Sequence, residues 1–92
     1  MLFFVKVRID VDKLVELGQK LQSKELDTSN MLSTYCIEQD PAVGLSIWEA
    51  EDQAEFEAKL EPLKAYYAEV IEIIPVITAV QAQQALMAQL GY

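Results

Sequence analysis

An apolar run that holds two cations opens the chain, from Leu2 to Ile9. Side chains of a strand point alternately to its two sides. One side of this run is therefore wholly apolar and carries Phe3, Val5, Val7 and Ile9. The other side carries Phe4, Lys6 and Arg8. The apolar side predicts contact with a core, and the charged side predicts contact with solvent, an interface or a cavity.

Two helices are predicted between the strands. Asp10 or Asp12 can cap the first, whose apolar residues follow at helical spacing: Val11, Leu14, Val15, Leu17 and Leu21. The second begins after Asp52, which forms a capping box with Glu55 three residues later. Pro62 lacks an amide donor, so the regular helix is predicted to end just before it. The apolar stripe of this second helix comprises Phe56, Leu60, Leu63 and Tyr67.

Three further strands are predicted at residues 31–38, 44–50 and 69–77. Residues 39–42 contain Pro41 and predict a turn, which makes the second and third strands a hairpin. The order strand, helix, strand, strand, helix, strand is that of a ferredoxin-like α+β fold with a four-stranded antiparallel sheet. In its usual strand order the first strand lies between the third and the fourth.

The length of 92 residues predicts a single domain. We expect a ferredoxin-like core at residues 1–78 and an extra C-terminal helix at 79–92, with Val80, Leu86, Met87 and Leu90 as its apolar side chains. Two helices cover only one face of such a sheet, and the other face is apolar enough to need a cover. The simplest cover is the sheet of a second copy, so we expect a homodimer or higher homo-oligomer with a barrel between subunits.

The charge balance excludes some partners. The chain has 15 acidic and 7 basic residues, for a net charge of −8. Phosphate backbones and anionic bilayers attract basic surfaces, so we expect neither nucleic acid nor a membrane as a partner. The opening lacks the pattern of a signal peptide, and the single cysteine, Cys36, permits no internal disulfide. These features predict a cytoplasmic protein.

The residue inventory also limits the chemistry. The chain has no histidine, one cysteine and only three scattered glycines. The usual zinc ligand sets, the Ser-His-Asp and Cys-His relays and the glycine-rich phosphate loops are therefore absent. We expect no metal and no organic cofactor, and any catalysis must use carboxylates, lysine, arginine, tyrosine, Cys36 or backbone amides.

The predicted topology brings charged residues of three strands together. The candidate catalytic set is Lys6, Arg8, Glu49 and Glu72, in which two cations could orient a small anionic substrate and a carboxylate could move a proton. Cross-strand ion pairing inside a dimer barrel is the alternative interpretation of the same four residues. Candidate ligand-lining residues are Phe4, Tyr35 and Trp48, although aromatic residues of this kind also fill cores.

Three segments resemble a known family. They are Met1-Leu2-Phe3-x-Val5-Lys6, Ser46–Ala50 followed by Phe56 and Leu60, and Ile71-Glu72-Ile73. In these segments the chain resembles muconolactone isomerase and the wider dimeric α/β-barrel group. The resemblance implies a cofactor-free isomerase or a related enzyme that acts on a small organic acid. The isomerase has a histidine where this chain has Phe4, so the alternative is a non-catalytic dimer that binds a small molecule or a partner protein.

Overall fold

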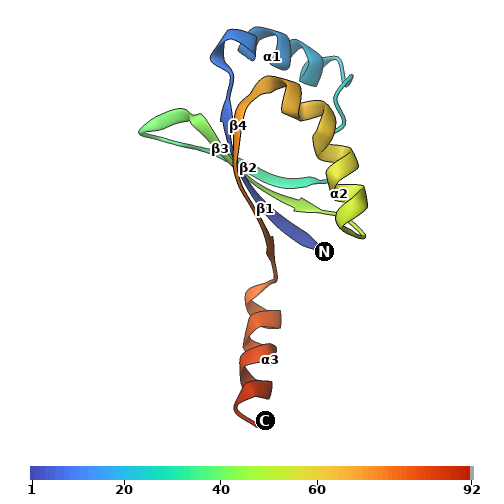
Figure 1. Ribbon diagram of the computed structural model, residues 1–92, viewed down its shortest axis with the longest axis vertical. Helices are drawn as coiled ribbons and strands as arrows, with labels where there is room; N and C mark the ends of the chain where they lie inside the picture. Colours follow the sequence, from blue (N-terminus) through green and yellow to red (C-terminus); the bar gives the residue numbers. More distant parts are fainter. Residues whose placement is uncertain (92) are drawn as a thin grey trace.

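The computed structural model describes residues 1–91 and contains one sheet of four antiparallel strands (Figure 1). The strands are β1 (Leu2–Ile9), β2 (Met31–Ile37), β3 (Asp40–Glu49) and β4 (Tyr67–Val76). They lie in the order β2-β3-β1-β4, so β1 occupies the predicted central position. The element order and the strand order confirm the ferredoxin-like α+β fold.

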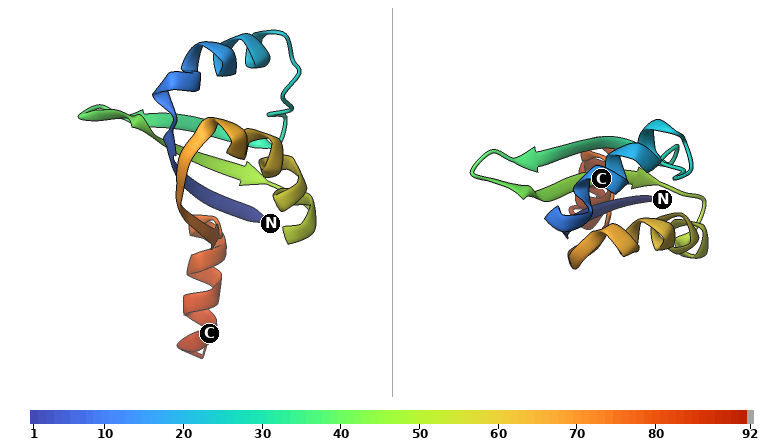
Figure 2. Two further views of the ribbon diagram at one scale, coloured as in Figure 1. Left: turned by 45° about the horizontal axis from the view of Figure 1, so that its top comes forward. Right: turned by 90° about the horizontal axis from the view of Figure 1, so that it is seen from above.

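Two of the three helices cover one side of this sheet, and the third extends from the other side. A short 3₁₀ turn, η1 (Val11–Lys13), leads into α1 (Leu14–Gln22), and α2 (Gln53–Leu60) continues into a second 3₁₀ segment, η2 (Glu61–Tyr66). Helices α1 and α2 lie on one side of the sheet, whereas α3 (Ala79–Gln89) extends away from the other side (Figures 1 and 2). One face of the sheet is therefore covered by helices and the other is open.

The core lies between the sheet and α2. Phe3 and Phe56 stack with ring centroids 4.2 Å apart, and Trp48 packs edge-on against Phe56 at 5.9 Å. Phe3, Val5 and Val7 of β1 are all buried, and no polar or charged side chain is buried within residues 1–91. The predicted alternation of β1 is thus confirmed, because its apolar side faces the core and its cations lie opposite.

Local sequence signals determine where α2 begins and ends. The Asp52 carboxylate accepts a hydrogen bond from the Glu55 amide at 2.8 Å, which satisfies one free donor of the first turn. The reciprocal half of the predicted capping box is wrong, because the Glu55 carboxylate instead accepts bonds from the Asn30 amide group and the Glu51 backbone. The helix ends at Leu60, as Pro62 predicts.

Beyond the end of α2, the buried residues no longer follow the α-helical spacing of its apolar stripe. Tyr66 is buried and Tyr67 begins β4, whereas the spacing of an uninterrupted helix predicted Tyr67 for the core. A 3₁₀ segment has about 3.0 residues per turn instead of 3.6, which rotates each later residue relative to the α-helical pattern. The segment η2 therefore turns Tyr66 inward.

Helix α1 packs less tightly than its stripe predicted. Leu17 is its only buried residue, and the predicted stripe residues Val11, Leu14, Val15 and Leu21 are exposed. The segment Val11–Lys13 is a 3₁₀ turn, so the residues before and after Leu14 do not follow one continuous helical repeat. The amphipathic pattern therefore predicted the helix correctly and overestimated its burial.

The β2–β3 hairpin turns earlier than predicted. Its turn residues are Glu38 and Gln39, and Pro41 lies inside β3. The pairing passes from Cys36↔Gly44 to Ile37↔Asp40, so three residues of β3 have no regular partner on β2. A proline fits such an irregular stretch because it donates no ladder hydrogen bond.

Candidate functional site

We call the sheet surface that α1 and α2 leave uncovered the open face. The strand register assigns residues from all four strands to it. Its apolar members are Leu2, Phe4, Val43, Leu45, Ile47, Ile74 and Val76. Its polar and charged members are Lys6, Arg8, Ser33, Tyr35, Glu49, Glu69 and Glu72. All four residues of the predicted catalytic set are thus on one face of the sheet.

Lys6 lies near the middle of this face. Its Cα partners are Leu45 of β3 and Glu72 of β4, so a cation and a carboxylate stand opposite each other on adjacent strands. Lys6 makes no ion pair within 4.0 Å in the described chain, residues 1–91. Phe4 follows at the next position of the same face, between Ile47 and Ile74. Lys6 is half-buried beside apolar side chains, and its ammonium group can bind an anion there.

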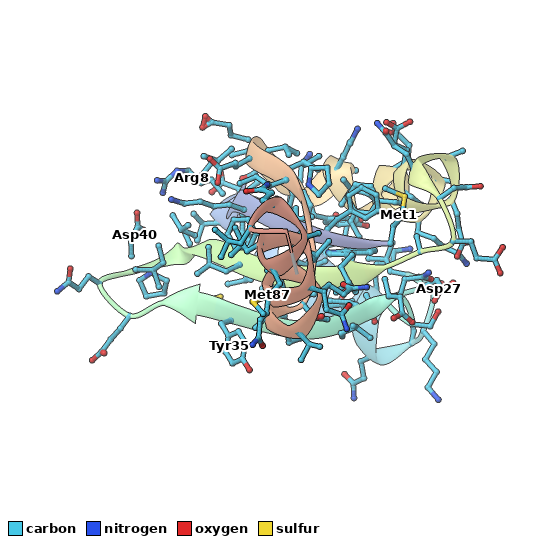
Figure 3. All side chains as sticks on the ribbon, turned by 90° about the horizontal axis from the view of Figure 1, so that it is seen from below. Met1, Arg8, Asp27, Tyr35, Asp40 and Met87 are labelled. Carbon is cyan, nitrogen blue, oxygen red and sulfur yellow. The ribbon has the colours of Figure 1, made fainter. Side chains whose placement is uncertain are left out.

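Arg8 has a partner that the sequence did not reveal. Its Nη1 lies 3.2 Å from Oδ2 of Asp40, and both side chains are close to half exposed. The sequence predicts a turn at Asp40, whereas this residue begins β3. Figure 3 shows both residues at the hairpin end of the sheet. No local signal connects residues 32 positions apart, and only the strand register brings them together.

Glu49 lies at the opposite end of the sheet from Arg8. It pairs with Leu2, four residues along β1 from Lys6, which corresponds to about 13 Å at the usual rise per residue. Glu49 lines a groove of about 530 Å³ at the base of α3, together with Met1, Leu2, Pro75, Val76, Ile77, Thr78 and Gln81. The predicted set of four is therefore spread along the open face, with only Lys6 and Glu72 directly opposite.

Of the three predicted ligand-lining residues, Phe4 and Tyr35 share a hollow of about 170 Å³ on the open face with Ser33, Leu45, Ser46 and Ile47. Trp48 lies on the other face, is fully buried against Phe56, and donates its indole N–H to the Ser46 hydroxyl at 2.8 Å. The structure thus brings Phe4 and Tyr35 together and places Trp48 in the core.

Residues 1–91 contain no group of three or more cysteine or carboxylate side chains arranged to hold a metal ion. None of the helices in this part of the chain is long and apolar enough to cross a membrane.

Comparison with known proteins supports the fold. No protein-family model and no curated protein matches this chain. A similar solved structure is 5-chloro-2-hydroxyhydroquinone dehydrochlorinase (TftG) from Burkholderia phenoliruptrix AC1100, in complex with 2,5-dihydroxybenzoquinone. The match has a TM-score of 0.59 and 14% sequence identity, and it covers 88% of this chain and 98% of that one. At this identity the likeness shows a shared fold and transfers no residue roles.

Proposed function

We propose that the open face binds a small organic acid and that the protein is a cofactor-free isomerase or a related proton-transfer enzyme. The observation that carries this proposal is the position of Lys6, opposite Glu72 and beside Phe4, without an ion-pair partner in residues 1–91. A cation, a carboxylate and an apolar wall are the groups that binding and proton transfer on a small acid require. The structural likeness to a small-molecule enzyme is consistent with this role.

In the proposed reaction the Lys6 ammonium group binds the carboxylate of the substrate. Phe4 and Ile47 contact its carbon skeleton, and Tyr35 borders the same hollow. Glu72 removes a proton from the carbon next to the bound carboxylate and returns it at another position of the same molecule. Arg8 adds positive charge at the hairpin end, where Asp40 holds it. Glu49 faces the groove at the base of α3.

We also propose that a second copy covers the open face. Helix α3 extends from the same side of the sheet as this face (Figure 1), so a copy that stacks there also meets α3. The exposed apolar residues of that side include Ile74 on the sheet and Leu86, Met87 and Leu90 on the helix. Uncovered apolar surface of this extent marks an interface in soluble proteins.

Carboxylate binding can be tested with benzoate as the probe and chemical shift changes as the readout. The Lys6→Gln variant is expected to bind benzoate at least tenfold more weakly, because the charge-assisted hydrogen bond is lost. Lys64→Gln is the matched control, since Lys64 is paired with Glu61 on η2 far from this face. Equal loss in both variants, or in neither, contradicts the site.

Catalysis is tested separately from binding. The α-protons of a panel of small carboxylic acids should exchange with deuterium in the presence of the protein. The Glu72→Gln variant should lose this exchange while its benzoate affinity stays within about twofold. Persistent exchange in Glu72→Gln would exclude Glu72 as the base.

A non-catalytic binding or interaction dimer is the second candidate. The hollow on the open face, about 170 Å³, favours an interaction dimer within this class, because pockets that bind ligands are usually larger, at about 300–1,000 Å³. If benzoate binds and no acid of the panel exchanges its protons, this second function is the correct one.

The dimer itself can be tested by light scattering. The expected mass is twice the 10.4 kDa of one chain. Met87→Glu places a charge on the face of α3 that carries Val80 and Leu90, and it should shift the mass toward the monomer. Ala85→Glu adds the same charge on the side of the helix away from Val80, Met87 and Leu90 and is the control. A monomer mass for the native chain contradicts the dimer.

A further inference from the structure

A pocket of about 240 Å³ that opens to solvent lies beneath α1, on the helix-covered face of the sheet, and two of its lining residues, Leu21 and Cys36, are exposed. Protein cores are close-packed, with few voids larger than a water molecule. A volume of this size exceeds the roughly 150 Å³ of a cavity that can hold benzene. The lining residues come from six elements and one loop: Val7, Ile9, Leu17, Leu21, Thr28, Met31, Thr34, Cys36, Gly44, Ser46, Leu63 and Tyr67.

The arrangement of α1 explains why this space stays open. Leu17 is the single buried contact of the helix, so its C-terminal half stands off from β2 and β3. The loop that follows α1 is held at a fixed place, because Asp27 pairs with Lys59 of α2 and the Asn30 side chain donates to the Glu49 carbonyl oxygen and the Glu55 carboxylate. These anchors fix the far end of the loop that leads from α1 back to the sheet.

The polarity of the lining selects a type of ligand. None of the twelve lining residues carries a charge, so the cavity offers no partner for an ion and disfavours one. The hydroxyl groups of Thr28, Thr34 and Tyr67 make no hydrogen bond to residues 1–91. The Tyr67 phenol is protonated at neutral pH and can donate a hydrogen bond, and burial raises its pKa further.

We propose that this cavity binds one neutral, monocyclic molecule that carries one or two oxygen atoms. The ring contacts Leu17, Leu21 and Met31, and an oxygen of the ligand accepts a hydrogen bond from Tyr67 or Thr34. The site lies on the face of the sheet opposite the proposed acid site and does not depend on it. The two sites also select opposite charge states, an anion on the open face and a neutral ring beneath α1.

The probe for this site is phenol, which is neutral at pH 7, and the readout is the methyl region of the ¹H–¹³C NMR spectrum. Phenol at millimolar concentration should cause saturable shifts at Val7, Leu17 and Leu21. Benzoate has the same ring and a charge, and it should leave these signals unchanged. It should instead shift Leu45 and Ile47 if the open face binds acids, so each proposal can fail alone.

Two variants and one control locate the phenol. Thr34→Leu fills the cavity from β2 and should abolish the saturable shifts, whereas Ser33→Leu makes the same kind of change on the open face and should not. Tyr67→Phe removes only a hydroxyl group and should weaken phenol binding about three- to tenfold while toluene binding stays unchanged. If Thr34→Leu fails to fold, the Tyr67→Phe variant still tests whether phenol binds beneath α1.

The single cysteine gives an independent readout. Cys36 is exposed and lines this cavity, so bound phenol should slow its alkylation by iodoacetamide. Shifts confined to Leu45 and Ile47, unchanged phenol affinity in both cavity variants, or no saturation at millimolar phenol would each overturn the proposal.

Discussion

Helices α2 and α3 begin in the same way and end up in different environments. Each has an N-cap side chain that accepts a hydrogen bond from the third residue of the helix: Asp52 from the Glu55 amide, and Thr78 from the Gln81 amide. Helix α2 buries Phe56 and Leu60, whereas α3 buries none of its residues in the single chain. The α3 cap is the more complete one, because the Gln81 side chain also accepts from the Thr78 backbone.

The comparison shows that capping and burial are separate properties. A cap depends on residues three positions apart and forms wherever the chain offers them. Burial depends on a surface that comes from distant segments, and Phe56 finds it in Phe3 and Trp48. Helix α3 and the residue after it carry Val80, Leu86, Met87 and Leu90, which meet no such surface in residues 1–91. An isolated helix of this length is marginal in water, which is why we assign α3 a place on a second copy.

The largest effect is expected where α2 enters the core. Phe56→Ala removes a ring that is 1% exposed and stacked on Phe3, and it should lower the free energy of unfolding by about 3–5 kcal/mol. Urea denaturation measures this loss. A change below about 1 kcal/mol would mean that α2 is no better anchored than α3.

Removal of α3 should have a smaller effect, and on association instead of folding. A chain truncated after Ile77 loses no buried residue of α3, so its monomer should keep the sheet and α2. We expect the dimer dissociation constant to rise about 10- to 100-fold, which corresponds to about 1.4–2.7 kcal/mol. Light scattering over a dilution series measures it. Unchanged dimer mass and melting temperature would show that α3 is a loose appendage.

Loss of each N-cap should change a different property of the protein. Asp52→Ala should lower the unfolding free energy by about 1 kcal/mol, because α2 is coupled to the core. Thr78→Ala costs its helix a similar amount, about 0.5–2 kcal/mol, but the loss should appear as faster amide exchange in α3 and weaker dimerisation. Equal effects of both variants on urea unfolding would show that α3 is also part of the core.

The smallest effect is expected at the loop that tethers α2. The hydrogen bond from Lys59 holds the pKa of the Asp27 carboxyl well below its usual range, and the same bond raises the pKa of Lys59. The stabilisation from a depressed carboxyl pKa is present above the ordinary aspartate range and is lost as the pH falls through the folded-state value. The raised lysine pKa gives stabilisation that is lost only as the pH rises above the ordinary lysine range.

Asp27→Asn should therefore lower the melting temperature slightly at neutral pH, and its difference from the native chain should shrink in acid. Added salt should shrink the same difference, because both side chains are exposed. Thermal melts at three pH values and two salt concentrations measure the effect. A difference that grows in acid would contradict the assignment of the pair.

Much of the fold could be predicted because its signals are local. The alternation of β1, the cap at Asp52 and the stop at Pro62 each depend on residues within one element. The prediction failed where one element depends on another. Tyr66 is the buried tyrosine and Tyr67 packs only partly buried against the core, because η2 changed the helical phase, and Pro41 entered β3 because the ladder is irregular there.

The candidate site divides in the same way. The sequence placed Lys6, Arg8 and Glu72 on one face because parity within a strand is a local property. It gave no sign that Arg8 pairs with Asp40 or that Trp48 is sealed against Phe56. Those contacts depend on strand register and helix packing.

The sequence by itself determined the elements, their order and the two-sided chemistry of β1, because hydrophobic period, caps and prolines act over a few residues. Only the tertiary structure decided which apolar residues are buried, which charges meet and where space remains. Leu17 is the only buried residue of α1, so a pocket persists beneath that helix, and α3 extends from the sheet without a partner among residues 1–91. Both outcomes follow from close packing, which is a property of surfaces that distant segments form together.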